Sequence, residues 1–225
     1  MYYGTKRVFD CVAATMLVVI AFPLWIVLVV LIRLDSKGPA LFKQQRVGSR
    51  RVVENGGTSW ELVTFTFYKF RTMYVDEHEP AHRVYMTAYI NNDIEYFSSR
   101  TGGYADGESF RLRDDPRVTR IGRVLRKLSL DELPQLLNVL RGEMSMVGPR
   151  PPMPYEVALY NDAQLQRLTA RGGVTGWAQV NGRCTIGFDD VVRLDAEYAR
   201  RQSFLFDLWI LLRTVPAVLS RRGAD

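Results

Sequence analysis

The sequence predicts an α+β protein that is mostly helical, with a small β-hairpin or sheet and a membrane-inserted helix at its N-terminus. The run from Cys11 to Ile32 contains no charged residue and is long enough to cross the roughly 30 Å hydrocarbon core of a bilayer. After it, short β-branched and aromatic runs are mixed with stretches of helical periodicity. We therefore expect two parts, a membrane helix over 1–35 and a globular domain over 36–225.

The membrane helix is expected to be re-entrant and bent at Pro23. A proline inside a helix removes a backbone donor and costs roughly 3 kcal/mol. Basic residues flank the apolar run on both sides, Lys6 and Arg7 before it and Arg33 and Lys37 after it, whereas a spanning helix usually has them on one side. A single span with a tolerated kink and a buried helix of a soluble protein remain open. The run is too long for a cleaved signal peptide, and no A-x-A site follows it.

A β-hairpin is expected next in the chain. Residues 35–39 form a turn cluster, and residues 41–47 and 62–70 are rich in β-branched and aromatic side chains, which is typical of strands. The Gly- and Asn-containing stretch 54–59 between them predicts the connecting turn.

Helices dominate the rest of the predicted domain. Periodicity and stop signals predict helices over 79–97, 118–128, 134–141, 155–170 and 188–201, a proline-stiffened loop over 146–154, and a turn and strand over 173–182. Residues 203–220 are apolar over most of their circumference. They form either a core helix or an interfacial amphipathic helix on the bilayer, with Phe206 and Trp209 at headgroup depth.

The charge balance of the chain limits the classes of binding partner that we expect. A net charge of +6 and a pI of about 9.4 suit an anionic membrane surface or phosphorylated substrates. No nucleic-acid-binding signature is present, so we expect no nucleic acid. The two cysteines, Cys11 and Cys184, form no zinc or disulfide framework. The string at 78–82 matches H-E-x-x-H, but Pro80 opposes the helix that this zinc motif needs.

An acidic pair, Asp131-Glu132, is the first candidate for chemistry. The stretch from Ser129 to Glu132 also reads as a capping box, in which the acids complement a helix dipole. If Pro134 instead opens the helix as its first residue, the acids lie on the turn before a positive helix end. Carboxylates, a divalent cation and phosphate can meet there.

Basic residues near this pair are candidates for phosphate binding. Arg150 lies between Pro149 and Pro151, which fix the backbone and leave a guanidinium ready to grip phosphate oxygens in a fork. Arg126 lies five residues before Asp131, and Lys69 and Arg71 form a second basic cluster. Each of these cations is alternatively a solvated surface charge.

Several strings together resemble one family. They are KRVFD (6–10), SKGPALFKQQRVG (36–48), YKFRTM (68–73), DDPRVTRIGRVLRKLSLDELPQLLNVLRGEMSMVGPRP (114–151), GVTGWAQVNGR (173–183) and DLWILLRT (207–214). In this order they resemble the bacterial sugar transferase family, the monotopic phosphoglycosyl transferases, over nearly the whole chain. The resemblance also implies a re-entrant helix bent at Pro23. Members often have Ser before that proline, and this chain has Phe22.

The resemblance implies a set of site residues. Asp131 and Glu132 match the catalytic dyad, with Glu132 and Asp131 as ligands of Mg²⁺; Mn²⁺ in its place stays open. Arg126 and Arg150 match phosphate-binding arginines, and Lys69 matches a family lysine, with Arg71 beside it. Asp195 and Gln135 are further candidates.

The implied activity is transfer of a sugar 1-phosphate from a UDP-sugar to polyprenyl (undecaprenyl) phosphate. It releases UMP through an aspartyl-phosphosugar intermediate and begins the membrane stage of bacterial glycoconjugate synthesis. The expected location is the bacterial plasma membrane, with 36–225 as a cytoplasmic catalytic domain; a homodimer stays open. Two alternatives remain, an inactive membrane scaffold of a glycan assembly complex and a magnesium-dependent membrane phosphatase or nucleotidyl transferase.

Overall fold

The computed structural model describes residues 2–54, 57–74, 79–93, 95–96, 115–182 and 186–219, with the side chains of 79–82 excepted. Within them the protein is mostly helical, with two small two-stranded sheets and a long apolar N-terminal helix. The H-E-x-x-H string, Cys184 and the loop expected after residue 97 lie outside the described residues or side chains.

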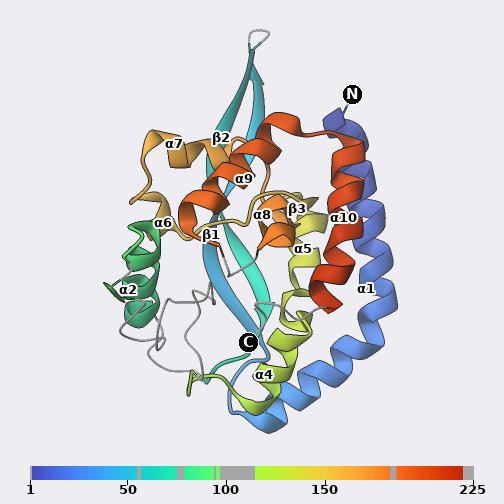
Figure 1. Ribbon diagram of the computed structural model, residues 1–225. Helices are drawn as coiled ribbons and strands as arrows, with labels where there is room; N and C mark the ends of the chain where they lie inside the picture. The colour runs from blue at the N-terminus through green and yellow to red at the C-terminus, as the bar shows by residue number, and fades with distance from the viewer. Residues whose placement is uncertain are drawn as a thin grey trace.

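The N-terminal helix α1 (Tyr2–Asp35) contains Pro23 in its interior. It is the one helix among the described residues that is long and apolar enough to cross a membrane, and only 11% of its most apolar window is buried. In Figure 1 its blue ribbon follows one edge of the molecule and then changes direction toward its C-terminal end. An internal proline is a common cause of such a bend.

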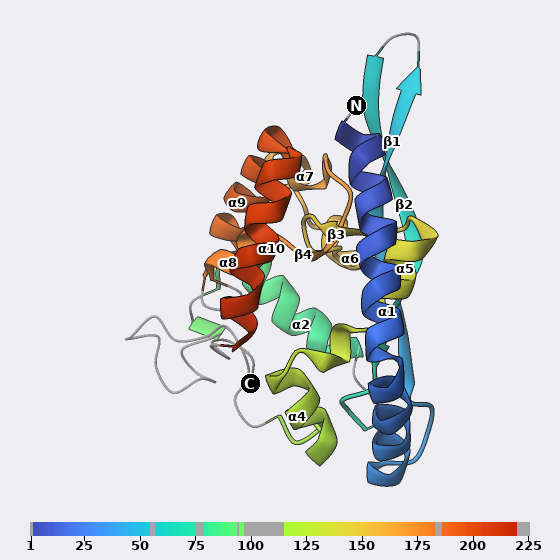
Figure 2. The same cartoon turned by 90° about the vertical axis from the view of Figure 1, so that its right-hand side faces the viewer.

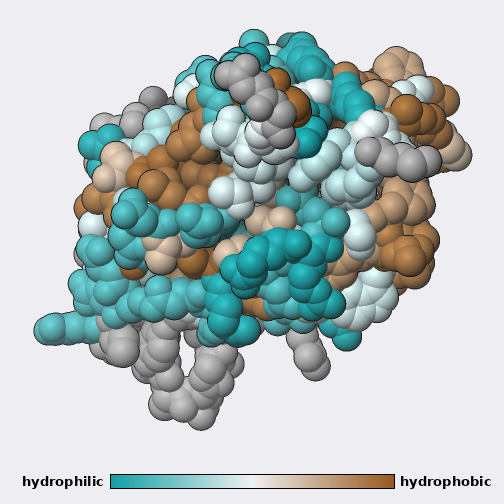
Figure 3. Space-filling view, turned by 90° about the horizontal axis from the view of Figure 1, so that it is seen from above, coloured by the Kyte–Doolittle hydropathy of each residue, from teal (hydrophilic) through white to brown (hydrophobic). Residues whose placement is uncertain are grey.

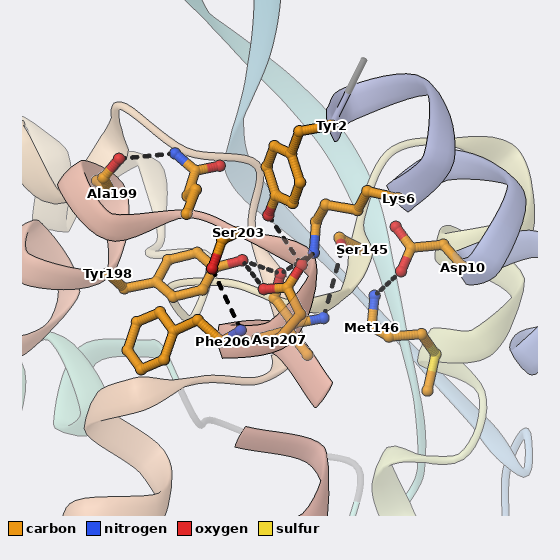
Figure 4. Close-up of polar contacts among 12 residues, drawn as sticks. Tyr2, Lys6, Asp10, Ser145, Met146, Tyr198, Ala199, Ser203, Phe206 and Asp207 are labelled. Carbon is orange, nitrogen blue, oxygen red and sulfur yellow. Dashed lines mark hydrogen bonds and ion pairs between the residues drawn. The ribbon is translucent and has the colours of Figure 1, made fainter. Parts of the chain in front are cut away.

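The first turns of α1 are fastened by a buried polar cluster (Figure 4). Lys6 Nζ lies 2.7 Å from Asp207 Oδ2, and the Tyr198 hydroxyl donates to the other carboxylate oxygen at 2.7 Å. The Tyr2 hydroxyl also donates to Asp207. One turn later, Asp10 accepts a hydrogen bond from the backbone N–H of Met146. These bonds join α1 to α10 (Phe204–Leu219) and to the segment before the proline loop.

The last turn of α1 is fastened as well. Arg71 donates to the carbonyl oxygens of Ser36 and Lys37, at 2.6 and 2.8 Å. Asp35 accepts from the backbone N–H of Ile121 at 3.0 Å. Both ends of the apolar helix are therefore bonded to the same globular body.

Strands β1 (Leu41–Glu54) and β2 (Gly57–Phe70) form an antiparallel hairpin. The hairpin was predicted, but the turn over 54–59 was wrong, because the strands run on to Glu54 and resume at Gly57. Cross-strand polar pairs extend the ladder, with Arg50 bonded to Glu61 and Arg51 to Thr58. The far end of the hairpin projects beyond the helices (Figures 1 and 2).

The remaining elements surround the lower half of the hairpin. In chain order they are α2 (Glu79–Ile90), α4 (Arg120–Lys127), the 3₁₀ turn η1 (Leu130–Glu132), α5 (Gln135–Arg141), β3 (Ser145–Val147), α6 (Pro154–Val157), α7 (Asp162–Leu165), the 3₁₀ turn η2 (Gln166–Leu168), β4 (Gly173–Thr175), α8 (Trp177–Asn181), α9 (Phe188–Arg201) and α10. Strands β3 and β4 pair in parallel.

Three element predictions were wrong in extent or type. The helix over 155–170 is broken into short pieces, because Asn161 caps a new helix at α7. The strand expected through 173–182 ends at Thr175, and α8 follows it. The helix over 79–97 stops at Ile90, and Asn92 has a left-handed φ of 51°.

The main core lies between the hairpin and the helices that cover it. It is formed by buried side chains from β2, α5, β3 and the C-terminal helices, among them Phe65, Phe67, Leu136, Val139, Met146, Tyr198 and Ile210. A smaller core joins the second half of α1 to the end of β2, through Leu28, Ile32, Phe70 and Leu125.

Helix α10 is not a core helix, since Asp207 and Ile210 are its only buried residues. Its exposed apolar side chains recur at helical spacing: Leu205, Leu208, Trp209, Leu212, Val215 and Leu219. Figure 3, seen from above, shows apolar residues along the right-hand edge, the side on which α1 and α10 lie in Figure 1. This edge carries the exposed apolar side chains of α1 and α10.

Candidate active site

The acidic pair lies on the short 3₁₀ turn between α4 and α5. The capping-box interpretation was wrong, because Ser129 has a left-handed backbone (φ 55°, ψ 22°) and its side chain does not cap the turn. Pro134 has helical dihedral angles and immediately precedes α5, as its N-cap and not its first residue. The turn buries Asp131 to 5% exposure, while Glu132 stays partly exposed.

Lys69, at the end of β2, joins both acids. Its Nζ lies 2.9 Å from Asp131 Oδ2 and 3.5 Å from Glu132 Oε1. The hairpin thus brings a cation from the first third of the chain onto the acidic turn.

Arg150 completes the cluster from the proline loop. Its Nη1 donates to Glu132 Oε1 at 2.9 Å, and the side chain retains 36% exposure. Two acids and two cations therefore meet within a few ångströms, with Asp131 on the buried side and Arg150 on the open side. We call Lys69, Asp131, Glu132 and Arg150 the acid–cation cluster.

The proline loop is held by its backbone carbonyls. Each of the four carbonyl oxygens of residues 149–152 accepts a hydrogen bond, in order from Gly173 N (2.9 Å), Arg167 Nη2 (3.4 Å), Arg46 Nη1 (3.0 Å) and Val47 N (2.8 Å). Prolines fix φ but not ψ, so these bonds supply the rest of the constraint. The loop is therefore pre-organised before any ligand arrives.

Asp195 supports this loop indirectly, through Arg167. Both Nε and Nη2 of Arg167 donate to Asp195 Oδ2, at 3.0 and 2.7 Å, and the two side chains are almost completely buried. Arg167 also donates to the hydroxyl of Tyr160. The structure places Asp195 against Arg167, through which it acts on the backbone of Arg150.

Arg46 contacts the proline loop and was not among the residues that the sequence analysis singled out. Its guanidinium donates to Gln44 Oε1 and to the carbonyl of Pro151. Burial lowers its pKa to about 10, and Glu156, Arg150 and Glu132 are among its electrostatic neighbours. The signal was the spacing of Gln44 and Arg46, since alternate strand residues share one face.

The other predicted cations lie elsewhere. Arg126, at the end of α4, donates from Nε to Thr72 Oγ1 at 2.9 Å. Arg71 is 5% exposed and its guanidinium is occupied by carbonyls at the end of α1. In this structure the side chain of Arg71 serves as a cap of the N-terminal helix, and phosphate binding by Arg71 stays a prediction.

Gln135 begins α5, one helical turn after Asp131, and is 1% exposed. No group of three or more His, Cys, Asp or Glu side chains that could hold a metal occurs among the described residues.

Comparison with known proteins agrees with the earlier resemblance. A family model described as bacterial sugar transferase matches residues 1–221. The exopolysaccharide production protein ExoY of Sinorhizobium fredii is 40% identical over 221 residues, covering 98% of this chain and 88% of the relative. The undecaprenyl-phosphate galactose phosphotransferase of Salmonella typhimurium is 39% identical over 219 residues, covering 97% of this chain and 41% of the relative.

A third relative is the undecaprenyl-phosphate glucose phosphotransferase of Komagataeibacter xylinus. It is 38% identical over 230 residues, covering 97% of this chain and 36% of the relative. This chain therefore spans most of the first relative and less than half of the length of the two phosphotransferases.

Proposed function

The chain belongs to the bacterial sugar transferase family, and we propose that it transfers a sugar 1-phosphate from a UDP-sugar to undecaprenyl phosphate. The names of two relatives support this reaction and differ in the sugar, galactose or glucose. The observation that carries the proposal is the acid–cation cluster, in which Lys69 pairs with the buried Asp131 and with Glu132, and Arg150 on its pre-organised loop pairs with Glu132.

The first step is attack by a carboxylate oxygen of Asp131 on the phosphorus that carries the sugar. The bond from that phosphorus to UMP breaks, and UMP leaves with the bonding electron pair. An aspartyl-phosphosugar remains on the protein. Lys69 and Arg150 stabilise the negative charge on the phosphoryl oxygens during this transfer.

In the second step, a phosphate oxygen of undecaprenyl phosphate attacks the same phosphorus. The bond to Asp131 breaks and the carboxylate is restored. The product is a sugar linked to the lipid through a diphosphate. Two displacements at one phosphorus need only one nucleophile on the protein, which fits the one aspartate of the acidic turn, Asp131.

Mg²⁺ fits this site, with Glu132 and Asp131 as its protein ligands. Magnesium is commonly held by one or two carboxylates together with substrate phosphates, and two carboxylates are what the acidic turn supplies. When bound, the ion neutralises diphosphate charge; Mn²⁺ can fill the same role.

The membrane arrangement follows from the two fastened ends of α1. The ends bond to one globular body through Lys6 and Asp35, among others, so a span with ends on opposite faces would separate bonded partners. This supports a re-entrant helix bent at Pro23. With α10 lying on the bilayer by its apolar face, the catalytic domain sits on the cytoplasmic side of the plasma membrane, beside the lipid phosphate.

The test is a panel of UDP-sugars incubated with undecaprenyl phosphate and detergent-solubilised protein, read by UMP release. Intact mass measured with the UDP-sugar alone should show a phosphosugar adduct on the wild type. Asp131→Asn should show neither turnover nor adduct and should still fold, with Asp190→Asn on the surface of α9 as the matched control. An equal adduct on Asp131→Asn would overturn the assignment of the nucleophile.

A further inference from the structure

Gln135 has a buried side chain whose polar atoms are unused. The residue is 1% exposed, and among the described residues neither its Oε1 nor its Nε2 has a hydrogen-bond partner. A buried amide without partners destabilises a fold. A contribution to stability therefore does not explain the buried amide of Gln135.

Asn138, on the same short helix, shows that the fold can satisfy a buried amide at this place. It is fully buried, donates to Thr66 O at 2.7 Å and to Glu143 Oε2 at 2.6 Å, and accepts from the backbone N–H of Tyr68. Asn138 thus joins α5 to β2. One turn earlier, Gln135 makes no such bond.

The position of Gln135 places it next to the acidic pair. Leu133 and Pro134 both have helical dihedral angles, so the backbone from Asp131 into α5 is close to continuous helix. Residues 131, 135 and 138, four and then three apart, therefore share one face. Asp131 meets Lys69 of β2, and Asn138 meets Thr66 and Tyr68. Along this face, Gln135 therefore lies between two residues that contact β2, Asp131 before it and Asn138 after it.

The chemistry of the neighbouring groups indicates at which stage of the reaction the Gln135 amide makes a hydrogen bond to Asp131. Gln and Asp four residues apart on a helix are within hydrogen-bonding reach. In the structure the Asp131 carboxylate is held by Lys69 through Oδ2. An arriving diphosphate competes for that ammonium, because phosphate oxygens attract it as the carboxylate does.

We propose that Gln135 is a positioning residue for Asp131: its Nε2 donates to the carboxylate oxygen that does not attack, once Lys69 turns to the substrate. This inference rests on the proposed function. The bond fixes the direction of the attacking oxygen. It also holds the carbonyl oxygen of the aspartyl-phosphosugar while the second substrate arrives.

The test compares Gln135→Leu and Gln135→Met with Asn138→Leu. Both Gln135 variants remove unpaired polar atoms at similar volume, so their melting temperatures should equal or exceed that of the wild type. Their kcat should fall about tenfold or more, the usual effect of losing one hydrogen bond to a charged group, while KM for the UDP-sugar stays within about twofold. Asn138→Leu should instead lower the melting temperature.

A second readout separates positioning from packing. In a single turnover with the UDP-sugar alone, the phosphosugar adduct should form about tenfold or more slowly in the Gln135 variants, whereas a packing role alone would change the melting temperature and leave this rate near that of the wild type. A normal kcat with a normal rate of adduct formation would overturn the inference, as would loss of folding in both variants, since the amide would then be structural. Asp131→Asn in the same assay distinguishes the failures: if it stays active, the proposed function fails as well.

Discussion

At the scale of single residues, Arg150 shows how position gives a side chain its chemistry. An exposed arginine is ordinarily a solvated charge, but here the backbone on both sides of it is fixed by prolines and by four carbonyl hydrogen bonds. The guanidinium therefore loses little freedom when it binds phosphate. Its partner Glu132 neutralises it until a substrate arrives.

Arg150→Lys keeps the charge and loses the planar fork that matches phosphate. We expect kcat to fall by about tenfold or more, with Arg150→Ala lower still, and the melting temperature to change little. Steady-state kinetics beside a melting curve measures both, and Arg193→Lys on the surface of α9 is the control. A Lys variant with normal kcat and normal melting would remove Arg150 from the active site.

Glu156, the third residue of α6, gives a prediction about pH. Burial raises its pKa above the ordinary value, although Arg46, Arg167 and Arg150 act in the opposite direction. The folded state then holds a proton that the unfolded chain has released, so stability is full below the unfolded pKa and falls as pH rises through the folded one. The wild type should therefore lose melting temperature from about pH 4.5 upward, more steeply than Glu156→Gln.

Asp115 provides the opposite control, because hydrogen bonding to Arg117 lowers its pKa. Its contribution to stability is present above the ordinary carboxyl pKa and is lost as pH falls, so Asp115→Asn should flatten the acidic side of the profile of melting temperature against pH.

Parallel profiles of melting temperature against pH for the wild type and Glu156→Gln would show that the burial of Glu156 has no energetic consequence.

At the scale of elements, α1 is held by polar bonds at both of its ends, while most of its apolar surface stays exposed. The pair of Lys6 and Asp207 has side-chain exposures of 8% and 4% and carries two tyrosine hydroxyl bonds as well. The cluster joins the membrane helix to α10, the other element with an exposed apolar face. The relative placement of these two elements therefore rests on a few buried bonds.

Lys6→Met should be strongly destabilising, because it leaves the Asp207 carboxylate buried without its cation. The expected cost is about 3–5 kcal/mol, which lowers the melting temperature by on the order of 10 °C for a chain of this size. Lys6→Met with Asp207→Leu should recover part of that loss. Arg50→Met, at the exposed pair with Glu61, should cost less than about 1 kcal/mol. Equal losses of melting temperature in Lys6→Met and Arg50→Met would contradict the stabilising role of the buried polar cluster around Lys6 and Asp207.

At the scale of the whole molecule, the apolar edge formed by α1 and α10 lies on one side of the body, and the acid–cation cluster lies on elements bonded to α1. A lipid substrate has its phosphate at the membrane surface and its chain within the bilayer. A catalytic domain attached along such an edge meets that phosphate without extracting the lipid. The architecture thus suits a reaction between a soluble nucleotide sugar and an embedded acceptor.

Both ends of α1 should face the cytoplasm. In a background with Cys11 and Cys184 replaced by Ser, Gly4→Cys and Lys37→Cys place single thiols at the two ends, and a Cβ at Gly4 meets no other atom within 4 Å. A membrane-impermeant maleimide should label neither site in intact cells and both after permeabilisation. Labelling of Gly4→Cys in intact cells would show a spanning helix and defeat the re-entrant arrangement.

The sequence by itself determined the elements whose signals are local. The apolar run, the hairpin, α4, α5 and α9 followed from periodicity and from stop signals such as Gly142. The acidic turn and the family also followed from adjacent residues. Where propensity was weak, the prediction failed: 155–170 broke at Asn161, whose side chain caps a new helix.

Only the tertiary structure decided which cations reach the acids and which serve the fold. Arg71 and Lys69 are two residues apart, yet one caps α1 and the other pairs with Asp131. Arg46 and Arg167 hold the proline loop from β1 and η2, far away in sequence. The local sequence around a long cationic side chain is the same whether the side chain pairs with the acids or holds the backbone. Its partner is decided by which elements pack beside it, and the residues next to it in the sequence do not determine that packing.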